Sequence, residues 1–506
     1  MILTDDTAPS IRRMDTMSPT TIHAPLRLVF ALLLLTLLAP VRAVAQQHFP
    51  TDAELGDMLR YLVEDGETPG IIIGLLEADG TTRVLHHGSA GAESRPLGPQ
   101  TVFAIGSINK TITGLLLADM VRRGEVSLED PVSMYLPDHV TVPSRDGREI
   151  TLLDLATHTS GLPRLPGNHR PADMSNPYAD YTIERMYEFL SSHELQHVPG
   201  EHGEYSNLGF GLLGHALASA AGSTYRDLVR ERILRPLGME HSGWLLEGDL
   251  GAWTAQAHDE YAEPVSFWFG TEAIDGAGGL RASMEDMLAY LRANVGEPTT
   301  DLERSMRLAQ EPRRPISGQD GDMGLGWQIA EVDYMVGSEA VPGVKRRIVM
   351  HGGATGGFRA WMGFDPQTGH GLVVLANAAL QDDLGFDLMK RGAPLDIPIV
   401  AVDRDLLRQY VGTYQIAPGR VAAVRLEDGG HLTFQAPGNV RFRMYAESDS
   451  TFYLKRTPWR IAFTRGADGA VDGLTLRIGE GRERQLPRTG AETPDARALA
   501  GNVRDD

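Results

Sequence analysis

The 506-residue sequence contains no cysteine, which excludes disulfide bonds, thiol chemistry and a lipidated N-terminal cysteine. Positive charge is also scarce, because 47 Lys and Arg residues stand against 67 Asp and Glu residues, a net charge of −20. This balance argues against nucleic acid or an anionic membrane surface as the main partner. Lysine occurs only four times, at positions 110, 345, 390 and 455. Because lysine is so rare here, a lysine that lies at helical spacing from a serine is less often a coincidence than in an average protein.

The N-terminal segment has the features of a signal peptide. Arginines precede an apolar run from Leu28 to Pro40, which is too short to span a bilayer comfortably. The run Ala43-Val44-Ala45 then supplies the pattern of small residues that a signal peptidase recognises. We expect residues 1–45 to be cleaved after Ala45, leaving a periplasmic or secreted protein with no stable membrane span. An uncleaved anchor is the alternative.

The length suits a large domain, residues 46–397, followed by a smaller one. Strands are predicted near both ends of the large domain, over Gly70–Glu77, Thr82–His86, Arg347–Met350, Phe358–Phe364 and Gly371–Ala376. Helices are predicted over Thr51–Glu64, Ile108–Arg122, Thr151–Thr157, Leu208–Ala221 and Ser283–Asn294. These patterns favour an α+β fold in which helices flank an antiparallel sheet and a helical subdomain adjoins it.

The sequence changes character after about Pro398. Short alternating apolar runs separated by Gly, Asp and Asn turns are typical of a small all-β barrel or sandwich, here residues 398–489. Residues 490–506 are expected to be a disordered tail.

Ser107 and Lys110 form a Ser-x-x-Lys pair at the start of an apolar helical stretch. Helical spacing of three residues places both side chains on one face, within reach of each other. A serine hydroxyl is a poor nucleophile until its proton is taken, and a partly desolvated lysine can hold the neutral amine that takes it. The alternative is a serine and a lysine on a solvated helix face.

Two further motifs carry groups that such a nucleophile needs. In Tyr205-Ser206-Asn207, a tyrosine near a lysine can have its pKa lowered and shuttle a proton, while the amide can hold a substrate carbonyl. His351-Gly352-Gly353 is expected at the edge of the preceding strand, where paired glycines allow a substrate backbone to approach. A backbone N–H beyond them can complete an oxyanion hole with that of Ser107. Simple turns are the alternatives for both motifs.

In this order the motifs resemble those of the penicillin-recognising serine hydrolases, in the branch of class C β-lactamases and D-Ala-D-Ala carboxypeptidases. Flanking stretches resemble the same family: Thr157-His-Thr-Ser-Gly-Leu-Pro163, Pro199-Gly-Glu201, Pro236-Leu-Gly-Met239, Gly276-Ala-Gly-Gly-Leu280, Gly324-Leu-Gly-Trp327 and Gly357-Phe358. The region after Val402, opened by Tyr410-Val-Gly-Thr-Tyr414, resembles the lipocalin-like β domain that some members carry. The resemblance implies a β-lactamase-type fold followed by a barrel-like domain.

The resemblance also implies roles for single residues. Ser107 would be acylated, Lys110 would activate it, and Tyr205 would act as general base and then as acid. Substrate binding would fall to Asn207, His351, Gly353 and Ala354, whose N–H completes the oxyanion hole. No cofactor is implied.

His351 stands where many members of the family carry the lysine of Lys-Thr-Gly, and a histidine there is mostly neutral at pH 7. In having a histidine at this position, the sequence resembles the DD-peptidases, esterases and aminopeptidases of the family more than its β-lactamases. The expected function is an exported serine hydrolase of D-alanyl peptides or β-lactams, with a peptide or small molecule as its partner and no nucleic acid. The alternatives are a carboxylesterase, a D-aminopeptidase or a non-catalytic penicillin-binding protein.

A competing motif is His193-Glu-Leu-Gln-His197, which matches the HExxH pattern of zinc proteases. That pattern requires both histidines on one helical face. Because Val198-Pro199-Gly200 would end a helix at once, we expect no metal site here.

Overall fold

The computed structural model describes residues 48–64, 68–91, 96–244, 248–259, 262–268, 270–318, 320–336, 339–378, 384–391, 402–427, 430–437, 441–454, 459–478 and 482–490. The expected signal peptide, residues 1–45, lies outside these ranges, and so does the expected tail, residues 490–506, except for Gly490, which is the last residue of a strand. Within them, no helix has both the length and the apolar character that crossing a membrane requires.

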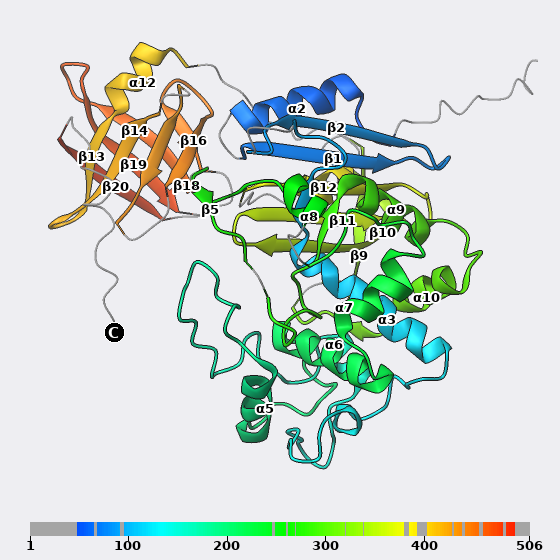
Figure 1. The fold of residues 1–506 in the computed structure, drawn as a ribbon. Helices are drawn as coiled ribbons and strands as arrows, with labels where there is room; N and C mark the ends of the chain where they lie inside the picture. Colours follow the sequence, from blue (N-terminus) through cyan, green and yellow to red (C-terminus); the bar gives the residue numbers. More distant parts are fainter. Residues whose placement is uncertain are drawn as a thin grey trace, which may run out of the picture. The chain divides into compact units, whose positions relative to one another are not determined.

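An eight-stranded antiparallel sheet forms the core of the large domain, in the order β2-β1-β12-β11-β10-β9-β8-β7 (Figure 1). Its strands are β1 (Gly70–Leu76), β2 (Thr82–Gly88), β7 (Arg314–Pro315), β8 (Asp322–Met323), β9 (Gln328–Val336), β10 (Glu339–Thr355), β11 (Phe358–Phe364) and β12 (Gly371–Ala376). Two small sheets pair β3 (Val102–Ala104) with β6 (Arg281–Ser283) and β4 (Ala257–His258) with β5 (Pro264–Val265). Strand β1 pairs with β12, with Ile73 opposite Val374, so the strands predicted near the two ends of the domain join one sheet.

Strand β1 is buried on both faces, which explains its unbroken apolar sequence. Ile71 and Ile73 pack with side chains of α2 and α11, whereas Ile72 belongs to the larger core that includes side chains of α9. The bounds of these helices are α2 (Asp52–Glu64), α9 (Met284–Val295) and α11 (Leu384–Arg391). The sheet is therefore covered by helices on both faces, as the sequence predicts.

The remaining helices include a cluster built around α3 and α6. Their bounds are α3 (Asn109–Arg122), α4 (Leu152–Ala156), α5 (Ile183–Ser192), α6 (Asn207–Ala221), α7 (Tyr225–Val229), α8 (Gly248–Trp253) and α10 (Asp301–Ala309), with the short turns η1 (Gly106–Ile108), η2 (Val132–Tyr135) and η3 (Arg230–Leu234). Helix α6 begins after Ser206, whose hydroxyl accepts the Gly209 N–H, and ends at Gly222 in the left-handed conformation. The predicted helices are confirmed to within one or two residues.

The C-terminal region contains a short helix, α12 (Arg404–Tyr410), and a closed eight-stranded barrel. The barrel strands are β13 (Gly412–Ala417), β14 (Arg420–Leu426), β15 (Leu432–Gln435), β16 (Phe442–Ala446), β17 (Thr451–Tyr453), β18 (Trp459–Arg465), β19 (Val471–Ile478) and β20 (Glu483–Gly490). Each strand pairs with the next along the chain, and β13 pairs with β20 to close the ring. Side chains such as Tyr414, Phe434 and Phe463 form its apolar core.

The structure corrects the expected position of His351-Gly352-Gly353. The strand expected to end at Met350 continues to Thr355, so the motif lies within β10 and does not follow it. Pairing with β9 stops at Met350, but pairing with β11 continues to Thr355 and keeps the chain extended. Among the described strands, the last part of β10 therefore pairs only with β11, and its other edge is open.

Candidate active site

Ser107 lies in the turn η1, directly before α3 and against the last part of β10. Gly106 has φ +52°, and a Cβ on it would lie 2.6 Å from the Ala354 nitrogen. A Cβ on Gly353 would lie 2.0 Å from the Ile105 carbonyl oxygen. The two glycines therefore allow the turn and the strand to approach so closely that Ser107 and Ala354 line the same cavities.

Lys110, in the first turn of α3, is completely buried. Its Nζ lies 3.0 Å from Ser107 Oγ, 2.9 Å from Asn207 Oδ1 and 2.8 Å from the Ala277 carbonyl oxygen. The predicted contact between serine and lysine is therefore present. Burial, assisted by the positive charge of Arg164, holds the pKa of Lys110 well below its usual range. Both causes favour the neutral amine.

The contacts of Lys110 also orient the lone pair of that amine. A neutral amine has two N–H groups and one lone pair, and two of its three neighbours, Asn207 Oδ1 and the Ala277 carbonyl, can only accept. When both N–H groups are used there, the lone pair remains for the hydroxyl proton of Ser107, 3.0 Å away. The geometry thus leaves the lone pair of a neutral Lys110 facing the Ser107 hydroxyl.

Tyr205 contacts the same pair, because Lys110 Nζ lies 4.9 Å from its ring centroid and its phenol interacts with Ser107. Burial raises the pKa of Tyr205 to about 12, although the hydrogen bond to Ser107 and the charge of Arg164 act in the lowering direction. The lowered pKa expected from the sequence is therefore wrong, because a neutral Lys110 offers no positive charge to a phenolate. At neutral pH the phenol of Tyr205 therefore carries its proton, so it has to donate that proton before it can accept one.

His351 is buried on β10, with only 2% of its surface exposed. Its Nδ1 lies 2.6 Å from the Gly352 carbonyl oxygen, which can only accept, so Nδ1 carries the proton. Burial is the main cause that lowers the pKa of His351 to about 3. The ring is therefore neutral at pH 7, and it supplies no fixed positive charge to a substrate.

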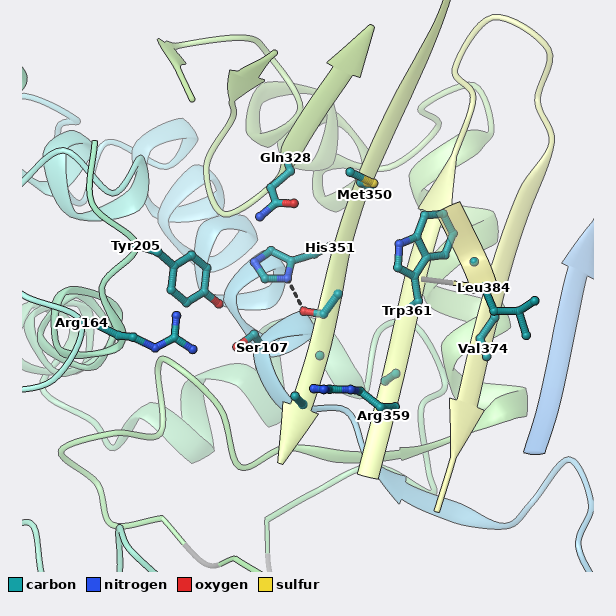
Figure 2. Close-up of a pocket in the computed structure, with 15 residues that line it drawn as sticks. Ser107, Arg164, Tyr205, Gln328, Met350, His351, Arg359, Trp361, Val374 and Leu384 are labelled. Carbon is teal, nitrogen blue, oxygen red and sulfur yellow. Dashed lines mark hydrogen bonds between the residues drawn. The ribbon is translucent and has the colours of Figure 1, made fainter. Parts of the chain in front are cut away.

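Two cavities flank Ser107. One, of about 380 Å³, is lined by Tyr205, His351 and Trp361 among others, and Figure 2 shows these side chains around it. The other, of about 370 Å³, is lined by Asn207 and by the aromatic rings of Tyr178 and Trp268. The structure thus brings the predicted groups together: Ser107, Lys110, Tyr205, Asn207, His351, Gly353 and Ala354 all lie at or directly beneath these cavities.

Sequence reasoning missed three residues at this site. Arg164 and Arg359 line both cavities, and His158 packs beneath the Tyr205 ring at a centroid distance of 4.3 Å. Arg164 directly follows the turn Ser160-Gly-Leu-Pro163. Because that turn belongs to a stretch that resembles the family, its position in the sequence could have indicated that Arg164 lies near the site. His158 lies inside a stretch that carries the family resemblance, but no pattern indicated the contact.

His158 supports Tyr205 from a strained backbone position, with φ +59° in a residue that is not glycine. Its Nδ1 accepts the Ser206 N–H at 3.0 Å, so Nε2 carries the proton of the neutral ring. Burial is the main cause that lowers the pKa of His158 well below its usual value. This second buried imidazole fixes the segment that carries Tyr205.

The HExxH motif does not form the helical histidine pair of a zinc protease. Helix α5 ends at Ser192, and His193 has extended backbone angles as its C-cap. The His193 ring stacks on Phe189, whereas His197 lies against His202. Within the described ranges, no cluster of three or more His, Asp or Glu residues is arranged to hold a metal ion.

Three buried histidines are expected to make the fold sensitive to acid. Burial is the main reason why the pKa of His48 and of His351 falls from 6.5 to about 3 and that of His158 falls well below 6.5. The folded state cannot take up the protons that the unfolded chain binds below pH 6.5, so stability is fully present above that pH and is lost as the pH falls toward 3. Over this range, each of these histidines lowers the free energy of unfolding by about 1.4 kcal/mol for every pH unit of acidification.

The midpoint of thermal unfolding, followed by tryptophan fluorescence, should therefore fall between pH 6.5 and about pH 5, where carboxyl groups of the unfolded chain stay ionised. His48→Phe keeps a ring against Phe49 and His370 and should make the slope shallower. Replacing His86, which is exposed on β2, should leave the slope unchanged. A midpoint that stays level over this range would contradict the interpretation.

A sheet covered by helices, with a serine and a buried lysine in contact beside it, is the arrangement of the penicillin-recognising serine hydrolases. Residues 55–389 match the Beta-lactamase family, and the chain belongs to that family. It is accordingly a serine hydrolase of the β-lactamase and DD-peptidase type. Residues 398–488 match DUF3471, a domain of unknown function.

Three similar proteins illustrate the relationship. The D-alanyl-D-alanine-carboxypeptidase/endopeptidase AmpH of Escherichia coli strain K12 is 33% identical over 320 residues, which are 60% of this chain and 78% of AmpH. Penicillin-binding protein 4* of Bacillus subtilis strain 168 is 25% identical over 449 residues, which are 82% of this chain and 94% of that protein. The class C β-lactamase of Rhodobacter sphaeroides has a structure that matches with a TM-score of 0.54 at 26% identity, covering 65% of this chain and 94% of its own.

Proposed function

We propose that this chain is an exported hydrolase that cleaves amide or ester carbonyls through an acyl-enzyme on Ser107. The leading substrates are D-alanyl peptides of peptidoglycan and β-lactams, in keeping with the carboxypeptidase and β-lactamase names of its relatives. The observation that carries the proposal is the 3.0 Å contact between Ser107 Oγ and the buried Lys110 amine, whose lone pair is free to accept the hydroxyl proton.

The proposed reaction has two steps. Lys110 takes the hydroxyl proton of Ser107 as Oγ bonds to the carbonyl carbon, while the Ser107 and Ala354 N–H groups stabilise the oxyanion. Tyr205 donates a proton to the departing amine or alcohol and regains one from Lys110, and Asn207 holds the substrate amide. Water then adds to the acyl ester, the acid leaves, and the proton returns to Oγ. Tyr205 acts first as an acid because its pKa is about 12.

One observation favours a second candidate within the same chemistry. A neutral, buried His351 offers no charge for a substrate carboxylate, and this suits a carboxylesterase or a D-aminopeptidase that takes uncharged acyl groups. A binding protein without turnover is the remaining alternative, but the base directed at Ser107 gives such a protein no advantage.

Two further parts of the proposal concern the whole chain. We propose that residues 1–45 direct export and are removed after Ala45, which fits enzymes that act on peptidoglycan. We also propose a boundary at residues 397 and 398, between the hydrolase domain and the barrel domain that ends near residue 489. Because aromatic and aliphatic side chains fill the barrel core, an accessory role suits it better than enclosure of a ligand.

The proposed function is tested by intact-mass spectrometry after mixing the protein with a fluorescent penicillin and, separately, with a chromogenic ester. An acyl adduct that persists indicates a peptidase, rapid turnover of the penicillin indicates a β-lactamase, and turnover of the ester alone supports the esterase. Ser107→Ala is expected to abolish adduct and turnover alike, by at least about 10³-fold. Ser219→Ala, which changes an exposed serine on α6, is the matched control. Adduct formation that survives Ser107→Ala would refute the proposal.

A further inference from the structure

Tyr205 lies in an irregular segment that His158 holds on both sides. Residues 203–206 form neither helix nor strand, so no regular ladder of main-chain hydrogen bonds fixes them. The N–H of Glu204 donates to the His158 carbonyl oxygen at 2.8 Å, and the N–H of Ser206 donates to His158 Nδ1 at 3.0 Å. One residue therefore binds the main chain directly before and directly after the proposed proton donor.

The His158 ring also supports the phenol ring itself. The ring centroids of His158 and Tyr205 lie 4.3 Å apart, with the planes tilted by 33°. The ring of Phe210, at the start of α6, lies 4.8 Å from that of His158, and both of these residues are almost completely buried. Because close-packed interiors leave little room for rings to shift, the imidazole sets the orientation of the phenol, whose hydroxyl Figure 2 shows directed toward Ser107.

The backbone of His158 is held in a conformation that few residues adopt. Its φ of +59° lies in the left-handed region, which costs a residue other than glycine about 1–3 kcal/mol and persists only where the surroundings fix it. In this conformation the carbonyl group and the ring of one residue both reach the segment that carries Tyr205. Strain of this kind is a reason to look for a function.

Histidine combines two properties that suit this position. Its neutral ring accepts the N–H of the buried Ser206, and burial, the main cause, keeps the pKa of His158 well below its usual value, so this acceptor persists at neutral pH. Its flat ring also fills the space against Tyr205. Asparagine tolerates the left-handed conformation and carries an acceptor at the same δ position, but it lacks the ring. Glycine tolerates the conformation and provides neither group.

We infer that His158 is a positioning residue for proton donation by Tyr205, and that it thereby determines how well the enzyme expels poor leaving groups. The inference rests on the proposed function, and it concerns a residue that lines neither of the two cavities. As the bond from the carbonyl carbon to the leaving oxygen breaks, Tyr205 gives its proton to that oxygen and takes the proton held by Lys110. The products are the acyl ester of Ser107, an alcohol and a neutral amine. A displaced phenol slows this step.

The test compares two esters with the same acyl group, an ethyl ester and a nitrophenyl ester. Ethoxide leaves only with a proton, whereas nitrophenolate is a stable anion and needs little help from Tyr205. In His158→Gly, kcat/KM for the ethyl ester should fall about 10²-fold, the effect of a misplacement of about 1 Å, and kcat/KM for the nitrophenyl ester less than about threefold. His158→Asn, which keeps the acceptor for Ser206, should lose only about three- to tenfold, again on the ethyl ester alone.

A double-variant cycle separates positioning of Tyr205 from general support of the fold. Because His158 acts through the phenol, adding His158→Gly to Tyr205→Phe should lower kcat/KM for the ethyl ester by less than about threefold more. Asp146→Gly is the matched control, because Asp146 has a similar φ of +52° and lies exposed in a remote turn. This control should leave kcat/KM for both esters unchanged.

A ratio of the two kcat/KM values that stays at the wild-type value in the His158 variants, or full additivity in the double variant, would overturn the inference. The unfolding midpoint shows whether His158→Gly folds, and if it does not, the ratio in His158→Asn decides alone. Failure of the proposed function gives a different result, namely no adduct on Ser107 and no turnover of either ester by the wild-type enzyme.

Discussion

Lys110→Met is expected to lower kcat/KM about 10³- to 10⁴-fold while leaving the protein folded. The substitution removes the base that we propose for Ser107, whose Oγ lies 3.0 Å from the amine, and general-base catalysis contributes effects of this size. Methionine fills a similar volume, and burying it does not carry the desolvation cost of an amine. The measurements are kcat/KM for the chromogenic ester, the rate of adduct formation by mass spectrometry, and the unfolding midpoint.

The stability of this variant is the sum of two opposing changes. Asn207 Oδ1 and the Ala277 carbonyl lose their donor, at a cost of about 1–3 kcal/mol each, whereas the buried amine no longer has to be desolvated. Lys345→Met is the matched control, because that lysine is exposed and pairs with Asp333 on the neighbouring strand. Activity within a few-fold of wild type in Lys110→Met would remove this residue from the mechanism.

Gly353→Ala is expected to lower kcat/KM about 10²- to 10³-fold, whereas Gly352→Ala should cost less than about threefold. A Cβ on Gly353 would lie 2.0 Å from the Ile105 carbonyl oxygen, a main-chain atom that cannot move aside without shifting η1. A Cβ on Gly352 would meet nothing closer than a Trp361 ring carbon at 3.9 Å, which is ordinary contact. The two substitutions add the same methyl group to adjacent positions of one strand.

The reason for the difference is the oxyanion hole that we propose. Moving β10 away from η1 separates the Ala354 N–H from that of Ser107, and donors displaced from an oxyanion stabilise it poorly. The measurements are kcat/KM and the unfolding midpoint of both variants, which separate loss of catalysis from loss of folding. Equal activity losses in the two variants would show that the close approach of strand and turn is unimportant for catalysis.

Local features of the sequence predicted much of the fold and most of the candidate site. The contact between Ser107 and Lys110 follows from a spacing of three residues along one helical stretch. Strand β1 and helices α3 and α6 were predictable because their apolar patterns and terminal glycines act within the element. The expected barrel was found, but β13 and β20, which close it, were not predicted as strands. Only Leu486 of β20 is buried, so that strand lacks an alternating apolar pattern.

The sequence by itself determined which chemical groups are present and which of them are neighbours along a helix or strand, because these relations depend on helical and strand geometry alone. Only the tertiary structure decided their protonation and the charge around them. The pKa values of Lys110, Tyr205 and His351 depend on burial, and burial is set by packing between distant segments. The convergence of Arg164 and Arg359 on Ser107 likewise joins residues that are 195 positions apart in sequence (359 − 164), and no local pattern encodes it.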